Sequence, residues 1–336
     1  MPCLRRLTGR CKVANARLAA KVVLSENVDL MKHPLFSPFF PIFFTTFLLC
    51  LTQAASADLI KTDVIRADDG RTLSRTELIA ELMQSDFILL GERHDNPHHH
   101  AIRGELIDAL AGKLAGRKPS IVMEYLDRGT RLDPALPMLE EMQRAGFNLQ
   151  GWQWPLHEPL FAAARSAGLP ILGGNLRRSD ARRVAMQGDP AIDGELAGLL
   201  VRAPLSGPAQ QRLDADLVDG HCGHLPASRL PNMRLAQRAR DAAMVSMLLG
   251  SRPGPVILLA GNGHVRRDYG VAALLRELAP TQRSVSIGFF ESNADLEHHL
   301  AKERGVFDYV WITPPAERDD LCAGFSMPAA KVTTKP

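Results

Sequence analysis

Short apolar runs that alternate with longer amphipathic segments constrain the fold of this chain more than any other feature. Runs of this length that are apolar almost throughout are typical of strands buried on both faces, as in parallel sheets. We therefore predict six strands in a mainly parallel sheet. The runs lie at 87–90, 121–124, 170–173, 256–260, 285–289 and 309–312.

The segments between these runs carry a helical pattern. Strands that alternate with helices predict an α/β fold, in which a mixed, mainly parallel sheet is flanked by helices. Asn96 and Pro97 form a strong start signal for the second helix, because Asn caps free N–H groups and Pro suits the first turn. The helices are expected at 75–84, 97–114, 136–145, 158–167, 231–249, 268–278 and 294–303.

The chain divides into segments of different character. From 179 to about 250 there is no strong strand, and helical pieces are broken by Gly and Pro. We expect a helical insertion there that covers one edge of the sheet. The main domain is expected at 58–315, and 316–336 is expected to be a loose tail.

The N-terminal region has the features of a targeting segment. Lys32 gives a basic start, 39–51 is an apolar core, and small residues end it at Ala57. This order predicts a signal peptide over 31–57, cleaved after Ala57. We expect residues 1–30 to be a non-native extension and the protein to be exported, periplasmic or associated with the outer membrane. A lipid anchor at Cys50 is the alternative.

Charge and cysteine content bound the possible partners. The first 57 residues hold seven basic and two acidic residues, which turns the formal +3 of the whole chain into −2 for the rest. A slightly acidic body gives no electrostatic reason to expect nucleic acid as a partner. Beyond Ala57 only Cys222 and Cys322 remain. They either pair in an oxidising compartment or stay free, and spacing does not decide between the two.

Polar side chains follow four of the predicted strands. Ligands of open α/β sheets sit beyond the carboxyl ends of the strands, so these side chains are expected at one rim. Imidazole and carboxylate together can bind a divalent metal or run acid–base chemistry, and arginine can hold the carboxylates of an anionic cofactor. The alternative is that such groups only pair or cap helices. The rim groups are Glu92, Arg93, His94, Glu124, Tyr125, Asn175, Arg177, Asn262 and His264.

Two further groups of histidines need a separate interpretation. His98, His99 and His100 lie in the first turn of the second helix, where exposure to solvent is favoured for at least two of them. His221 lies in a Gly- and Pro-rich loop, where a plain loop is favoured over structural zinc and an axial haem ligand stays open.

At these residues the chain resembles the ChaN family of iron-regulated haem-binding proteins, in the wider group that includes Tiki and TraB proteins and erythromycin esterases. The matching stretches are "LLGERHDNPHH", "VMEYLDR", "GWQWP", "EPLFAAARSAGLPILGGNLRR", "HCGHLP", "AQRARDAAMV" and "LLAGNGHVRRDYGV". The resemblance implies a mixed α/β fold, a location at the bacterial envelope, and haem binding, for which a homodimer that shares haems is one arrangement.

The resemblance also implies roles for particular residues. It implies tyrosine ligation of iron, for which Tyr125 and Tyr269 rank first because both follow rim motifs, while Tyr309 lies elsewhere. It further implies histidine and basic residues on the haem propionates, and this chain departs from relatives by carrying His157 where they often have an aromatic. The candidate cofactor-binding residues are Tyr125, Tyr269, His94, Arg93, Arg177, His221 and His264.

Three functions follow. The first is an envelope haem-binding protein that takes part in iron or haem uptake, with an outer-membrane haem receptor as a possible partner. The second is a metal-dependent hydrolase of esterase or peptidase type, in which a divalent ion is held by Glu92, His94, Glu124 and His264. The third is a scaffold that only binds a partner. The residues alone do not choose between the first two, and the resemblance favours haem.

Overall fold

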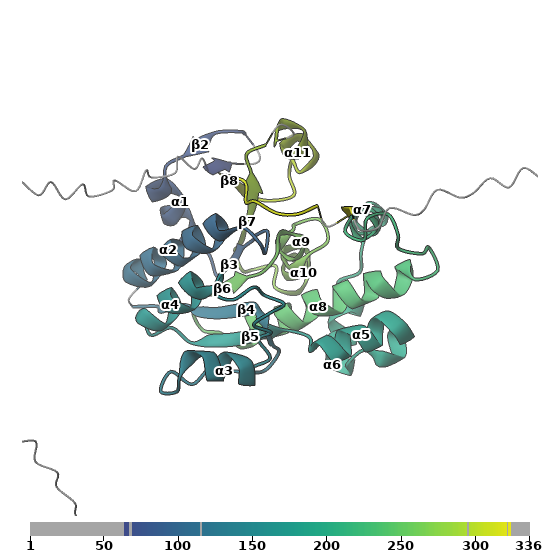
Figure 1. Cartoon of the computed structure of the whole chain (residues 1–336). Coiled ribbons are helices and arrows are strands. Elements are labelled where there is room, and N and C mark those ends of the chain that lie inside the picture. Colours follow the sequence, from purple (N-terminus) through teal and green to yellow (C-terminus); the bar gives the residue numbers. More distant parts are fainter. Residues whose placement is uncertain (1–63, 67–68, 115, 294–295, 321, 324–336) are drawn as a thin grey trace, which may run out of the picture. The chain divides into compact units, whose positions relative to one another are not determined.

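The computed structural model describes residues 64–66, 69–114, 116–293, 296–320 and 322–323 (Figure 1). All of them belong to the unit Ala57–Pro336. The expected signal peptide, its cleavage site and Cys50 lie outside the described residues. Among the described helices, none combines the length and the apolar character needed to cross a bilayer.

The described strands form one sheet in the order β2-β1-β8-β7-β3-β6-β4-β5. Neighbours from β8 to β5 pair in parallel, whereas β1 pairs antiparallel with both β2 and β8. All six predicted strands are confirmed. The strands are β1 Val64–Arg66, β2 Thr72–Leu73, β3 Phe87–Leu90, β4 Ser120–Asp127, β5 Ile171–Asn175, β6 Val256–Leu259, β7 Ser284–Glu291 and β8 Tyr309–Thr313.

The predicted helices are also confirmed within a few residues at their ends. Asn96 caps α2 as expected, since its side-chain oxygen accepts from His98 N at 2.9 Å. The helices are α1 Arg75–Leu82, α2 Pro97–Lys113, α3 Met138–Arg144, α4 Glu158–Ser166, α5 Arg178–Gln187, α6 Gly194–Arg202, α7 Gly207–Asp219, α8 Leu230–Gly250, α9 Asn262–Val265, α10 Val271–Leu278 and α11 Leu296–Lys302, with a short 3₁₀ helix at Asp189–Ala191.

The sheet is covered on both faces, which explains why its strands are continuously apolar. In β3, Ile88 and Leu90 pack into a cluster that contains residues of α1, α2 and α4. Phe87 and Leu89, which point the opposite way, pack with residues of α8 and α10. All four side chains are fully buried. Successive side chains of β3 therefore belong to two separate apolar layers, one on each face of the sheet.

The helical stretch expected over 179–250 is present, but its placement differs from the expectation. It comprises α5 to α8, and α5, α6 and α8 lie side by side in Figure 1. Met244, Val245 and Leu248 of α8 are buried against Val122 of β4 and the residues of β6. This helix therefore covers a face of the sheet and not only an edge, because its apolar stripe needs that face to be buried.

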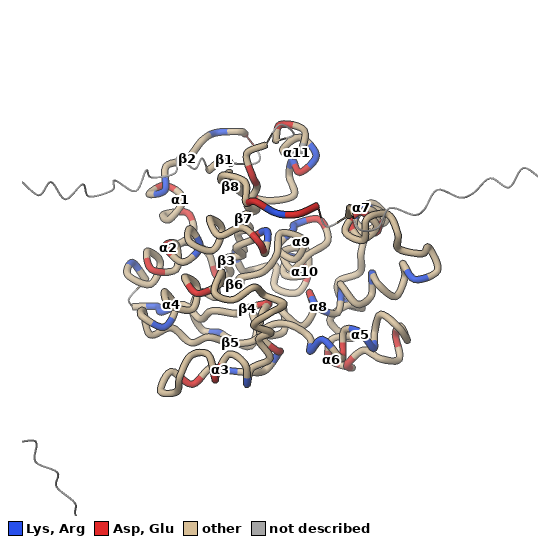
Figure 2. The backbone as a smooth tube through the Cα atoms, in the orientation of Figure 1, with Lys and Arg blue, Asp and Glu red and all other residues tan. Residues whose placement is uncertain are grey.

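The described residues after β8 make contacts with the domain, whereas residues 324–336 of the expected loose tail lie outside the described residues. Arg318 forms ion pairs with Asp95 at 2.6 Å and with Glu291 at 2.5 Å. Cys322 forms a disulfide with Cys222, with 5.6 Å between their Cα atoms. We call residues 314–323 the C-terminal strap. Figure 2 shows the alternation of acidic and basic residues along it.

Candidate functional site

The chain after β3 is joined closely to β7 on one side and to the chain after β6 on the other, and these contacts build the rim. Gly91 N donates to Ile287 O at 2.8 Å, and Asn262 N donates to Glu92 O at 2.9 Å. A β-carbon at Gly91 would lie 2.9 Å from Ile287 O and would overlap the Asn262 side chain. Only glycine fits there, so the chain can turn directly from the buried strand into Glu92 and His94.

Glu92 is the centre of a buried network beneath the rim. Its carboxylate forms an ion pair with Arg103 of α2, and both side chains are fully buried. His100 Nδ1 lies 3.1 Å from Glu92 and 3.0 Å from Arg103 Nη2. The Tyr125 hydroxyl accepts from the same Arg103 nitrogen at 2.9 Å. The guanidinium therefore already supplies the positive charge that this buried carboxylate needs.

His157 completes the buried group from the other side. Its Nε2 lies 4.0 Å from Glu92 Oε1, and its ring packs 4.2 Å from that of His100, centroid to centroid. Burial lowers the pKa of His100 to about 4 and that of His157 to about 2, so both rings are neutral at physiological pH. Potential ligand atoms of Glu92, His100 and His157 lie within 4.8 Å of one another.

Glu124, His264 and Asp241 form a second network, between β4, α9 and α8. His264 Nδ1 lies 2.6 Å from Asp241 Oδ1, and its Nε2 lies 3.2 Å from Glu124 Oε1. Glu124 also accepts from Gly261 N at 2.8 Å. Burial alone would lower the pKa of His264, but the two carboxylates raise it to about 10. His264 is therefore an imidazolium, which in turn holds the pKa of Glu124 below its ordinary value although burial opposes this.

His94 lies between the two networks and is exposed. Its Nδ1 lies 2.5 Å from Glu92 Oε1, while 43% of the side chain is accessible to solvent. A β-carbon at Gly261 would lie 2.9 Å from His94 Nε2 and 3.7 Å from Glu124 Oε2, so the missing side chain leaves space at that nitrogen. Glu92 accepts a hydrogen bond from the Nδ1–H of His94. The lone pair of the ring that can bind a metal is therefore on Nε2.

Of the other predicted site residues, Tyr125 is gathered at this point, whereas Tyr269, Arg93, Arg177 and His221 are not. Tyr125 and Tyr269 are both buried, and the Tyr269 hydroxyl donates to Asp216 at 2.8 Å. Burial raises the pKa of both phenols, although Arg103 and Arg266 oppose the shift. Three exposed residues have their own contacts elsewhere: Arg93 lies 3.7 Å from Glu291, Arg177 pairs with Asp180, and His221 Nδ1 donates to Leu217 O.

A cavity of about 270 Å³ opens beside this site at the end of β4. Glu124, Tyr125 and Trp152 line it, with Arg178 and Arg240 on its polar side. The Trp152 ring also packs edge-on against His94, 4.9 Å between centroids. The pairing of β4 with β5 shifts register between Met123 and Asp127, and residues of this irregular stretch line the cavity.

Sequence reasoning missed four residues of the two networks. His100 belongs to a triple for which exposure was expected for at least two members, yet both His99 and His100 are fully buried. Arg103 and Asp241 lie inside helices, where a charged residue normally indicates a solvated face. The role of His157 was signalled only by its departure from the family pattern. A charged residue on the apolar stripe of a helix was the available signal for Arg103 and Asp241.

A class of protein is now defined: an α/β protein whose parallel strands deliver carboxylates and histidines to a ligand site at their carboxyl ends. The sequence model of the family described as "Haem-binding uptake, Tiki superfamily, ChaN" matches residues 78–275. The chain belongs to this family.

One solved structure agrees with this one at the level of the fold. ChaN of Campylobacter jejuni, whose structure is described as showing cofacial haem binding, is 20% identical with a TM-score of 0.62, over 76% of this chain and 97% of that one. An erythromycin esterase variant, EreC, in its open conformation is 14% identical with a TM-score of 0.42, over 78% of this chain and 99% of that one. No curated protein matches the sequence.

Proposed function

We propose that the protein is an exported haem-binding protein that takes part in iron or haem uptake. The observation that carries the proposal is the exposed imidazole of His94, whose Nδ1 is held by the buried carboxylate of Glu92. An imidazole oriented in this way is a suitable axial ligand for haem iron. Family membership and the haem bound by the Campylobacter jejuni relative support it.

The residues around His94 favour histidine over tyrosine as the ligand of the haem iron. Each of the three tyrosines is at most 3% exposed. A neutral, buried phenol is a poor ligand for ferric iron, because the phenolate is the form that binds. Trp152 offers an apolar surface beside His94, and Arg178 and Arg240 can pair with propionates. The cavity of about 270 Å³ would enclose only part of a porphyrin.

Titration of the purified protein with hemin tests this assignment. We expect a Soret shift for wild type, a loss of affinity of at least about tenfold in His94→Ala, and little change in Tyr125→Phe. His221→Ala is the matched control, since His221 is also exposed but lacks a carboxylate partner. An absent Soret shift at micromolar wild-type protein would exclude haem binding. Loss of the shift in Tyr125→Phe alone would return the ligand to tyrosine.

The remaining parts of the proposal concern assembly and location. A homodimer that shares haems at its interface is proposed from the family alone, and mass determination with and without hemin tests it. An outer-membrane receptor would be the partner of an exported haem carrier. Fractionation of cells that express the full chain, with N-terminal sequencing of the product, tests export and cleavage after Ala57.

A divalent metal ion is the second candidate, and one observation favours it. His94 and His264 are both held at Nδ1 by a carboxylate, and the Nε2 of each lies near Glu124. Histidine ligands of metals are usually oriented in this way. Such a site would polarise water for hydrolysis when an ion is bound. Metal analysis of protein purified without added metal tests it, and an ion lost in His264→Ala but retained in His221→Ala would support it.

A further inference from the structure

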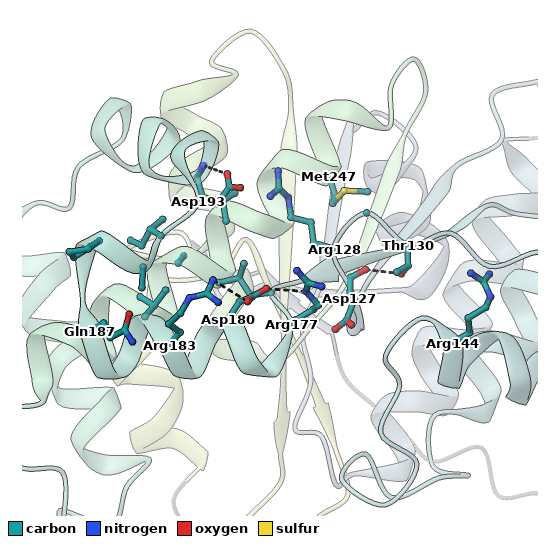
Figure 3. Close-up of a pocket in the computed structure, with 18 residues that line it drawn as sticks. Asp127, Arg128, Thr130, Arg144, Arg177, Asp180, Arg183, Gln187, Asp193 and Met247 are labelled. Carbon is teal, nitrogen blue, oxygen red and sulfur yellow. Dashed lines mark hydrogen bonds and ion pairs between the residues drawn. The ribbon is translucent and has the colours of Figure 1, made fainter.

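A larger cavity, of about 1020 Å³, lies between the turn after β4 and the helices α5 and α6 (Figure 3). It adjoins the smaller cavity beside His94, because Asp127 and Leu176 line both. Its volume is at the upper end of the range for small-molecule sites. The haem and metal sites proposed at His94 do not occupy this cavity.

The inner wall of the cavity is apolar. The side chains come from α5, α6 and α8, from the residue after β5 and from the loop before α6, and two of them, Leu196 and Ala239, are fully buried. A wall of this kind favours the hydrocarbon part of a ligand over water. The apolar residues that line it are Leu176, Val184, Ile192, Leu196, Ala239 and Met247.

Two guanidinium groups converge at the rim on one carboxylate. Asp180 accepts from Arg177 Nε at 3.0 Å and lies 3.1 Å from Arg183 Nη2, as the dashed lines in Figure 3 show. Their side chains are 69% and 51% exposed. Each guanidinium has five N–H donors, so most remain available after these contacts. The trio carries a net positive charge and is suited to hold an anionic group.

The other charged groups of the lining are already engaged. Arg128 is tied to Glu195 at 2.5 Å and to Ser246 at 2.9 Å, and Arg144 is paired with Glu141. Asp193 accepts from the backbone at the start of α6. Asp127 faces Arg177, which offsets its negative charge. Arg177 and Arg183 are shared with Asp180, and Arg177 also with Asp127, and we assign their remaining N–H donors to a bound anion.

The lining also differs from the His94 site in its chemistry. The described residues that line the cavity include no histidine, cysteine or tyrosine. A ligand here would accordingly be held by its carboxylate and its apolar body, without coordination of a metal.

We propose that this cavity binds an amphipathic carboxylate, with the hydrocarbon part against the apolar wall and the carboxylate on Arg177 and Arg183. Two sources share this chemistry, a fatty acid and a metal-free tetrapyrrole. The site is independent of haem at His94, although the two cavities adjoin.

Fluorescence titrations with cis-parinarate and with metal-free protoporphyrin test the proposal on the full chain, with and without saturating hemin. We expect one of these probes to bind at one per chain, and hemin to leave that binding in place. Arg177→Gln together with Arg183→Gln should weaken it about tenfold. Arg182→Gln is the matched control, because Arg182 is exposed on the same helix but does not line the cavity.

Two further measurements distinguish binding in this cavity from adsorption to the protein surface. Methyl esters of the probes should bind more weakly than the acids, and Ala191→Trp should block binding because Ala191 lines the cavity. The probe that binds identifies the source. Binding of neither probe, one-for-one displacement by hemin, or equal affinity of the double arginine variant and the Arg182→Gln control would overturn the proposal. None of the probes contains iron, so a failure of haem binding leaves this test intact.

Discussion

At the scale of the residue, His264 shows how two carboxylates change the role of an imidazole. A histidine that follows a buried strand is readily interpreted as a general base or as a metal ligand. Contacts with Asp241 and Glu124 instead stabilise its protonated form, with a pKa of about 10. Binding of a metal at Nε2 would therefore have to displace a proton.

This protonation predicts a pH dependence of stability. The folded-state pKa of His264 lies above the ordinary value of 6.5, so its stabilisation is complete below pH 6.5 and is lost as the pH rises towards about 10. We expect the free energy of unfolding to fall across this window by at most about 1.4 kcal/mol per pH unit. Urea titrations at several pH values measure the slope.

Asp241→Asn should flatten that slope, because it removes the carboxylate that lies 2.6 Å from Nδ1. His221→Gln serves as the control, since His221 is exposed and its Nδ1 donates to the Leu217 carbonyl of its own turn. Parallel stability curves for wild type and Asp241→Asn between pH 6.5 and 10 would contradict the assignment of an imidazolium.

At the scale of the element, the C-terminal strap fixes the loop that carries His94. Arg318 bonds both carboxylate oxygens of Asp95, and it also pairs with Glu291, which accepts from Asn96 at 2.7 Å. Asn96 in turn donates to Pro314 O of the strap at 3.0 Å. The position of His94 therefore depends on a segment more than 200 residues away in the sequence.

Removal of this contact should loosen the loop. We expect Arg318→Gln to lower the free energy of unfolding by about 1–3 kcal/mol, because it leaves the buried Glu291 carboxylate with fewer partners. Amide hydrogen exchange over 92–100 should become faster. Arg71→Gln, which breaks an exposed pair with Glu77, should change neither quantity. Unchanged exchange in Arg318→Gln would show that the loop holds its position without the strap.

Much of the fold could be predicted because each strand and helix has a local signal. The continuous runs of β3 and β6 and the Asn96–Pro97 start of α2 specify their elements within a few residues. Long-range contacts lack such signals. β1 and β2 have only three and two residues; β1 pairs with β8, and β2 pairs with β1. The sequence located Glu92 and His264 but not their partners Arg103 and Asp241, because these lie inside helices and nothing local shows that their side chains face the sheet.

At the scale of the whole molecule, the disulfide joins two distant parts of the chain. Cys222 and Cys322 are separated by 100 residues, and the segment between them includes α8, β6, β7 and β8. A closed loop of this size reduces the conformational freedom of the unfolded chain substantially. The bond therefore stabilises the sheet and the strap together.

Replacement of both cysteines by serine should lower the free energy of unfolding by about 2–5 kcal/mol. Thermal unfolding with and without a reductant measures this effect. The reductant should lower the melting temperature of wild type and leave that of the double serine variant unchanged. Equal sensitivity of both proteins to the reductant would contradict a bond between Cys222 and Cys322.

The same bond also makes the completion of folding measurable, because the thiols of Cys222 and Cys322 react only before it forms. Cys322 follows β8, the last strand of the described sheet, and it meets Cys222 only when the strap has crossed to the turn after α7. A chain that has not completed this step presents two reactive thiols, whereas a finished one presents neither of them. A maleimide added during refolding, followed by mass analysis of the peptides that contain Cys222 and Cys322, would thus count the immature molecules.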